Sequence, residues 1–216
     1  MQVIDLTHTL ETGMPVYPGS EPASLDKKAR VETEGYNEIQ LHISSHTGTH
    51  IDCGKHFIQD GHDTGTSAPE RFVGKGMVID CRHLNNPPVI SRALLLPYEN
   101  KLEKADFVLF HTGWSRFWGV SDYYRGFPVP DTEAARYLTG FGLKGIGTDT
   151  MSFDPVESHG HAVHKVLLSS GITLIENLTN LEALPEDEFL FCCFPLKIRD
   201  GDGSPVRAVG IVMSDE

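Results

Sequence analysis

Apolar and polar residues alternate along the segment from residue 39 to residue 44. Ile39, Leu41 and Ile43 are apolar, and the residues between and after them are polar. A period of two is typical of a β-strand with one buried face. The pattern therefore predicts a half-buried strand that leads the chain towards His46.

Six further apolar runs also predict strands, because they are rich in β-branched or aromatic residues and mostly end at Gly, Pro or Asp. Two segments predict helices: one begins at the capping residue Asp131 and stops at Gly140, and the other runs from about residue 161 to residue 169. Neither repeats nor linkers interrupt this order, so we expect a single α/β domain, residues 1–216. The predicted strands are residues 3–6, 77–80, 107–111, 172–176, 189–198 and 206–213.

Composition narrows the class of protein. The 216 residues include 18 Lys and Arg, 30 Asp and Glu, and 11 His, for a formal charge of −12. Such a charge disfavours nucleic acid and anionic membranes as partners. Apolar runs are too short to span a membrane and no secretion signal precedes the first strand, so we expect a cytoplasmic protein with reduced cysteines.

A glycine motif can be dismissed on mechanism. Residues 140–145, Gly-Phe-Gly-Leu-Lys-Gly, match GxGxxG. Dinucleotide binding needs this motif between a strand and a following helix, whereas here it follows a predicted helix. We interpret it as a helix stop and turn.

One short segment gathers several metal-ligand side chains. His46, His50, Asp52 and His56 lie within eleven residues, interspersed with Gly and Thr that favour a loop over a helix. Imidazole nitrogens and carboxylate oxygens suit Zn²⁺, Mn²⁺ or Fe²⁺, and no paired cysteine suggests a structural thiolate site. The alternative is a solvated loop in which histidines happen to cluster, but four candidate ligands favour a metal site.

Further ligands are expected from a second group. Glu176 ends a predicted strand, and His164 lies on the helix expected to pack against that strand, which makes His164 a better candidate than His159 or His161. A buried carboxylate such as Glu176 would need a metal or a basic partner. Asp149 and Asp154 could equally be structural caps or walls of the site.

The order of these motifs resembles the metal-dependent cyclase/hydrolase family, which includes bacterial kynurenine formamidase and isatin hydrolase. The resemblance rests on His46-Thr-Gly-Thr-His50-Ile-Asp52 with His56 four residues later, and on supporting blocks along nearly the whole chain. These blocks are Pro15-Val-Tyr-Pro-Gly19, His111-Thr-Gly-Trp114, Gly145-Ile-Gly-Thr-Asp149, Leu174-Ile-Glu176, Pro195-Leu-Lys197 and Ser204-Pro-Val-Arg-Ala208.

The resemblance implies a centre of two divalent metal ions, with Zn²⁺ favoured over Mn²⁺. Its implied ligands are His46, His50, Asp52, His164 and Glu176, where the last two keep the family's spacing of twelve residues. The resemblance gives the role of catalytic proton carrier to His56.

One stretch departs from the family pattern. Members commonly have Asp-Ala-Pro-x-His, whereas this chain has Asp52-Cys53-Gly54-Lys55-His56. Gly54 lacks the fixed φ of Pro, and Lys55 would add a cation near the cleft, so the pocket and the substrate could differ.

The implied fold is a compact domain around a central mixed sheet or barrel of the swivelling β/β/α type, assembled as a homodimer or homotetramer. The implied activity is hydrolysis of a small amide, first of all N-formylkynurenine in tryptophan catabolism. Alternatives are an isatin-like cyclic amide or lactone hydrolase, a polyketide-type cyclase, or a non-enzymatic protein with a closed metal site. Candidate pocket walls, which could equally be core or interface packing, are Tyr17, Trp114, Phe117 and Trp118.

Overall fold

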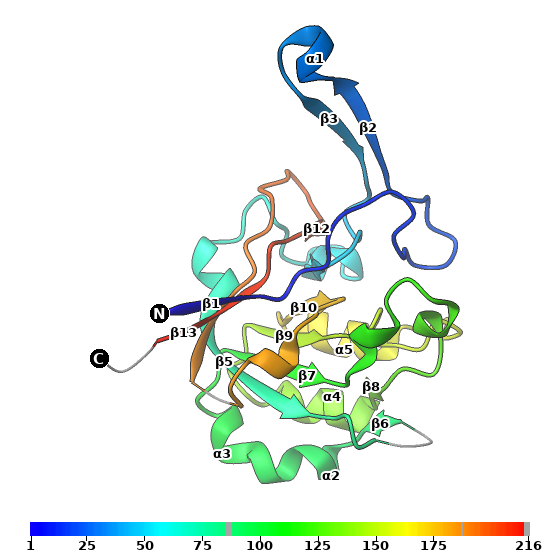
Figure 1. Cartoon of the computed structure of the whole chain (residues 1–216). Coiled ribbons are helices and arrows are strands. Elements are labelled where there is room, and N and C mark those ends of the chain that lie inside the picture. The colour runs from blue at the N-terminus through cyan, green and yellow to red at the C-terminus, as the bar shows by residue number, and fades with distance from the viewer. Residues whose placement is uncertain (85–87, 187, 214–216) are drawn as a thin grey trace.

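A curled, mixed β-sheet forms the centre of the molecule (Figure 1). The computed structural model describes residues 1–84, 88–186 and 188–213. Within these ranges the sheet has nine strands, in the spatial order β1 (Gln2–Asp5), β13 (Val209–Val212), β11 (Phe189–Cys192), β5 (Val73–Asp80), β7 (Phe107–His111), β9 (Gly145–Thr148), β10 (Thr173–Glu176), β4 (His50–Asp52) and β12 (Gly203–Pro205).

The four middle strands β5, β7, β9 and β10 are parallel, and the strands on either side of them are antiparallel. Parallel neighbours need crossover connections, which here contain helices. The helices on the body of the molecule are α2 (Arg92–Leu95), α3 (Glu99–Leu102), α4 (Thr132–Leu138) and α5 (Ala162–Ser169), and a small parallel pair joins β6 (Val89–Ile90) to β8 (Val129–Pro130).

Alternation along the strands divides the core into two layers. In β7, Val108 and Phe110 face the helices, whereas Phe107 and Leu109 pack in the layer on the other face of the sheet. All four side chains are buried, as expected for a central strand covered on both faces. The sheet is thus fixed on both sides, which gives its strand ends a rigid support.

Both predicted helices are confirmed, and two of the residues predicted at their ends, Asp131 and Gly171, have the expected roles. The carboxylate of Asp131 accepts the backbone N–H of Ala134 at 2.7 Å and so caps α4. Gly171 follows α5 with a φ of +79°, a left-handed conformation that glycine adopts without strain. The GxGxxG stretch connects α4 to β9 and is therefore a turn after a helix, as its position indicates. No helix within the described ranges is long and apolar enough to cross a membrane.

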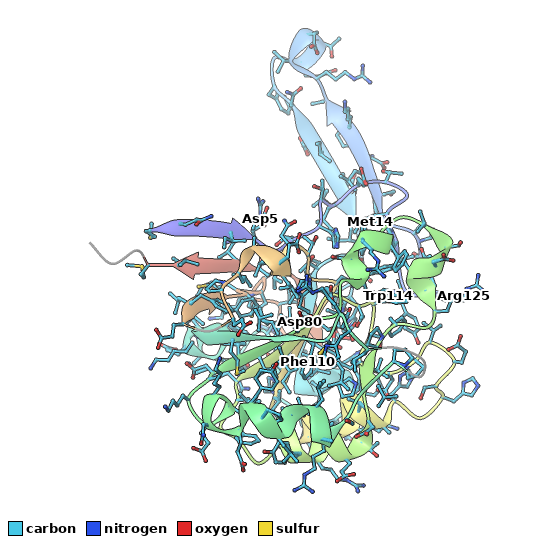
Figure 2. All side chains as sticks on the ribbon, turned by 60° about the horizontal axis from the view of Figure 1, so that its bottom comes forward. Asp5, Met14, Asp80, Phe110, Trp114 and Arg125 are labelled. Carbon is cyan, nitrogen blue, oxygen red and sulfur yellow. The ribbon has the colours of Figure 1, made fainter. Side chains whose placement is uncertain are left out.

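The prediction of a half-buried strand at residues 39–44 is only partly right. Strand β3 (Glu38–His42) forms, but it pairs with β2 (Ser24–Ala29) in an arm that carries helix α1 (Val31–Glu34) at its tip. Figures 1 and 2 both show this arm, residues 24–42, projecting away from the body. Ile39 and Leu41 are 54% and 49% exposed, and every residue of β3 is exposed, so the described chain does not bury this strand.

The predicted strand at residues 189–198 ends early. Strand β11 stops at Cys192, and Pro195 keeps a single bridge to Val206. Proline has no backbone N–H to donate to a ladder, and Phe194 and Leu196 beside it are exposed. The segment from residue 194 onwards is instead a loop that leads to β12 beside β4.

The two-layer core makes a quantitative prediction. Truncating the fully buried Leu109 to Ala should lower the free energy of unfolding by about 2–5 kcal/mol, because it leaves a cavity under the central strand. Leu190→Ala on β11 of the same sheet serves as the control, since Leu190 is exposed and its truncation should cost less than about 1 kcal/mol. Urea denaturation curves of both variants measure the difference, and equal losses would contradict the layer assignment.

Candidate metal centre

Two adjacent antiparallel strands bring the first three ligand-type side chains together. In the register of β4 with β10, His50 lies directly opposite Glu176. Because side chains alternate, Asp52 points to the same face as His50, while Ile51 packs on the opposite face. The residues around His50 thus form a strand rather than the predicted loop, and a left-handed turn at Gly48, with φ of +65°, precedes that strand.

Helix α5 adds His164 from the helical side of the sheet. Its Nε2 lies 3.1 Å from Glu176 Oε1 and 3.5 Å from Asp52 Oδ2. The opposite ring nitrogen, Nδ1, contacts Asp154 Oδ2 at 2.7 Å. Asp154 also accepts the backbone N–H groups of Val163 and His164, so it caps the helix and orients the imidazole at once.

His46 lies on the turn before β4 and approaches Asp52 from a different direction. Its Nδ1 is 2.6 Å from Asp52 Oδ1, and its Nε2 is 2.9 Å from Asp202 Oδ2. His50 completes the group, with Nε2 at 3.3 Å from Asp52 Oδ1 and 3.5 Å from Glu176 Oε2.

The three imidazoles share one arrangement that suits a metal ion. Each has one ring nitrogen engaged by an outer acceptor, which is Asp202 for His46, the Gly48 carbonyl for His50 at 2.8 Å, and Asp154 for His164. Each directs its other nitrogen towards Asp52 and, for His50 and His164, also towards Glu176. An outer acceptor that fixes the tautomer is what metal-binding histidines need. This donor set therefore fits one or more divalent metal ions.

Buried charge gives an independent reason for a cation here. Asp52 and Glu176 are 1% and 5% exposed. Burial opposes ionisation of Asp52, but the charge of His46 and hydrogen bonds from the histidines hold the pKa of Asp52 well below its usual range. Burial also opposes the charge on His164, yet bonds to Asp154, Asp52 and Glu176 raise the pKa of His164 well above its usual range. The site therefore demands positive charge, which metal ions can supply as well as protons can.

His56 lies beside this group on the short 3₁₀ turn Gly54–His56. Its ring centroid lies 3.9 Å from that of His46, with the two rings tilted by 33°, and its Nδ1 is 3.5 Å from Asp202 Oδ2. Burial lowers the pKa of His56, so a neutral imidazole is favoured at neutral pH. Among the described residues, His46, Asp52 and His56 also form one of three groups close enough to share an ion.

The candidate ligands face a cavity of about 280 Å³. Of the four predicted pocket aromatics, Tyr17 lines it, whereas Trp114, Phe117 and Trp118 do not. These three pack instead in a neighbouring cluster around Tyr123. The walls are formed by Pro15, Val16, Tyr17, Ser20, His46, Gly48, His50, Asp52, His56, Phe57, Met151, Ser152, His161, His164, Glu176 and Asn177.

The expectation that Lys55 adds a cation near the cleft is not supported by its position. Lys55 does not line the cavity, and its ammonium pairs with Asp200. Gly54 is buried, and a Cβ there would lie 2.8 Å from the His62 ring. Any larger residue would therefore clash with His62, which explains glycine at this position.

The remaining candidates separate into structural and cavity residues. Asp149 is buried and accepts backbone N–H groups of Thr112 and Trp114, so it holds a turn. His161 lines the cavity, and its backbone is left-handed, with φ of +45°. His159 is exposed and does not line the cavity.

Sequence reasoning missed Asp202, which contacts His46. Its only sequence signal is a position in Asp200-Gly-Asp-Gly203, a composition typical of turns, and β12 reaches β4 only through the sheet topology.

Comparisons with known proteins agree with this chemistry. Residues 4–155 match a family described as "Putative cyclase". A kynurenine formamidase of Erythrobacter litoralis is 32% identical over 96% of this chain and 93% of its own length, and one of Bacillus cereus is 30% identical over 95% of each. Isatin hydrolase A from Labrenzia aggregata superimposes with a TM-score of 0.89 at 28% identity, over 99% of this chain and 94% of the other.

The geometry predicts metal binding that depends on the converging side chains. His164→Gln should lower bound Zn²⁺ after dialysis by at least half, because His164 faces both buried carboxylates. His159→Gln is the matched control, since His159 is exposed five residues away and should leave the metal content unchanged. Elemental analysis of the two proteins decides the matter, and equal metal in both would contradict the assignment.

Proposed function

The chain belongs to the Cyclase family, and on that premise we propose that it is a metal-dependent hydrolase that cleaves the formyl amide of N-formylkynurenine to kynurenine and formate. The observation that carries the proposal is the convergence of three imidazoles on two buried carboxylates beside a further imidazole, His56, in one cavity. The full-length similarity to kynurenine formamidases supports the choice of substrate.

Two divalent ions are proposed as cofactors, Zn²⁺ before Mn²⁺, held by His46, His50, Asp52, His164 and Glu176. The position of Asp52 supports two ions, because its Oδ1 faces His46 and His50 while its Oδ2 faces His164. Bound ions would lower the pKa of water towards neutrality and polarise the amide carbonyl.

His56 is proposed to carry the proton. In hydrolysis of a formyl aryl amide, a proton leaves the attacking water and the departing aryl amine gains one. A neutral imidazole can accept and then return that proton. The lowered pKa of His56 favours the neutral form, and its ring lies at the cavity wall next to His46.

The cavity walls support a small aromatic substrate. The cavity volume of about 280 Å³ is just below the roughly 300–1,000 Å³ typical of small-molecule sites, which favours a small substrate. Tyr17, Phe57 and Met151 supply apolar side chains to the cavity wall, and the Phe57 ring lies 4.4 Å from that of His56. A flat aryl ring would contact these side chains while its formyl group reaches the histidines and carboxylates.

A cyclic amide related to isatin is the second candidate substrate. The close superposition on isatin hydrolase A favours it, and the same ligand set would serve either amide. The ratio of kcat/KM for N-formylkynurenine to that for isatin distinguishes the two, and we expect it to exceed ten. A ratio below one would reverse the assignment.

A second copy of this chain is the proposed partner, in a homodimer or a homotetramer. The projecting arm exposes Val31, Tyr36, Ile39 and Leu41. A two-stranded hairpin is marginally stable by itself in water, so the arm needs a surface to pack on. The cytoplasmic location stays a prediction from the sequence.

The role of His56 predicts a separation between metal binding and turnover. His56→Ala should keep its zinc, because the five proposed ligands remain, while kcat for N-formylkynurenine falls by about 10²–10⁴-fold. His159→Ala should keep both zinc and kcat. Steady-state kinetics with parallel elemental analysis measure the effect, and wild-type turnover in His56→Ala would show that another group carries the proton.

The arm predicts a dependence of assembly on its apolar side chains. Replacing both Tyr36 and Ile39 with Glu should shift the protein to monomers, because charge would be buried against the second copy. Gln40→Glu alters the same strand at an already polar, exposed position and should leave assembly intact. Sedimentation velocity reports the masses, and an unchanged mass for the double variant would exclude this face as the interface.

A further inference from the structure

Asp202 occupies a place between the proposed metal ligands and the proposed proton carrier. One oxygen, Oδ2, lies 2.9 Å from His46 Nε2 and 3.5 Å from His56 Nδ1. The centroids of the two rings lie 3.9 Å apart, and the rings are tilted by 33°. A single carboxylate oxygen therefore contacts both imidazoles, one from a proposed metal ligand and one from the proposed proton carrier.

The backbone around Asp202 is fixed by close packing against the first motif. The Asp202 carbonyl accepts the N–H of Cys53 at 2.7 Å, and the Gly201 carbonyl accepts the N–H of Thr64 at 3.0 Å. A Cβ at Gly203 would lie 2.7 Å from His46 Cε1, so only glycine lets the His46 ring approach this closely. The carboxylate is thus aimed at the two rings by a rigid loop.

Its surroundings differ from those of the other outer acceptors. The side chain of Asp202 is 41% exposed, whereas Asp154, which plays the corresponding part for His164, is buried. Hydrogen bonding to His46 lowers the pKa of Asp202 against the opposing effect of partial burial. This partly exposed carboxylate contacts His56 without being enclosed among the proposed metal ligands.

We propose that Asp202 is a positioning residue that orients His46 towards the metal centre and holds His56 against it. The Asp202 carboxylate accepts the Nε2–H of His46. The other ring nitrogen of His46, Nδ1, then faces Asp52. The contact with His56 keeps that ring beside His46. This inference rests on the proposed function, because it assigns Asp202 a part in the same site.

The proposal predicts two separate losses when the charge is removed. Outer carboxylates of metal-binding histidines typically contribute 10–100-fold to metal affinity, and Asp202→Asn should lose zinc affinity by that factor. When saturated with zinc, Asp202→Asn should also lose kcat with little change in KM, because His56 is less well held. This loss should shrink in a His56→Ala background, since both changes act on one group.

The loop offers a matched control and a conservative rescue. Asp200→Asn removes a carboxylate two residues away that pairs with Lys55 outside the cavity, and its zinc affinity should stay within two-fold of the wild type. Asp202→Glu keeps the charge and should recover affinity and kcat to within a few-fold. Competition with a chromophoric zinc chelator measures affinity, and thermal unfolding of the metal-free proteins measures the integrity of the loop.

The outcomes separate this inference from the proposed function. Wild-type protein that binds no divalent ion would overturn the metal centre, and this inference with it. Wild-type protein that binds zinc, with Asp202→Asn unchanged in both affinity and kcat, would overturn the role of Asp202 alone. Equal losses in Asp202→Asn and Asp202→Glu would show that only the loop is disturbed, and would also overturn it. Loss in Asp202→Asn with recovery in Asp202→Glu supports it.

Discussion

Two carboxylates, Asp52 and Glu176, are buried on adjacent antiparallel strands, and this placement requires positive charge between them. Isolated buried carboxylates are costly, and here three imidazoles surround them. The sheet is rigid enough to hold them because its middle strands are packed on both faces. Outer acceptors such as Asp154 and Asp202 then fix which nitrogen each imidazole presents. Core packing, helix capping and metal-site geometry are thus parts of one arrangement.

The parts of the structure that depend on local pattern were predictable from the sequence. The central strand at residues 107–111 and the helix capped by Asp131 form as expected, since apolar runs and capping residues act over a few positions. Five candidate ligands meet in space, and His164 is the helix histidine that joins them. Twelve residues separate His164 from Glu176, because the rest of α5 and then the length of β10 lie between them.

Features that depend on distant segments could not be read in the same way. Ile39 and Leu41 have the alternation of a half-buried strand, but whether a face is covered depends on what packs there. Trp114, Phe117 and Trp118 pack around Tyr123 rather than along the cavity. An aromatic side chain is suited to a core cluster and to a cavity wall alike, so the sequence does not distinguish the two positions. Asp202 reaches His46 because β12 lies beside β4, and the two residues are 156 positions apart, so the turn composition around Asp202 does not indicate its partner.

The buried charges are proposed to hold catalytic metal ions in a sheet that folds without them. Titration of the purified protein with a chelator, followed in parallel by hydrolysis of N-formylkynurenine and by thermal unfolding, tests this proposal. We expect activity to vanish while the protein stays folded, and to return when Zn²⁺ is restored, because the two core layers do not depend on the metal. Activity that persists without metal, or unfolding that accompanies its removal, would contradict the proposal.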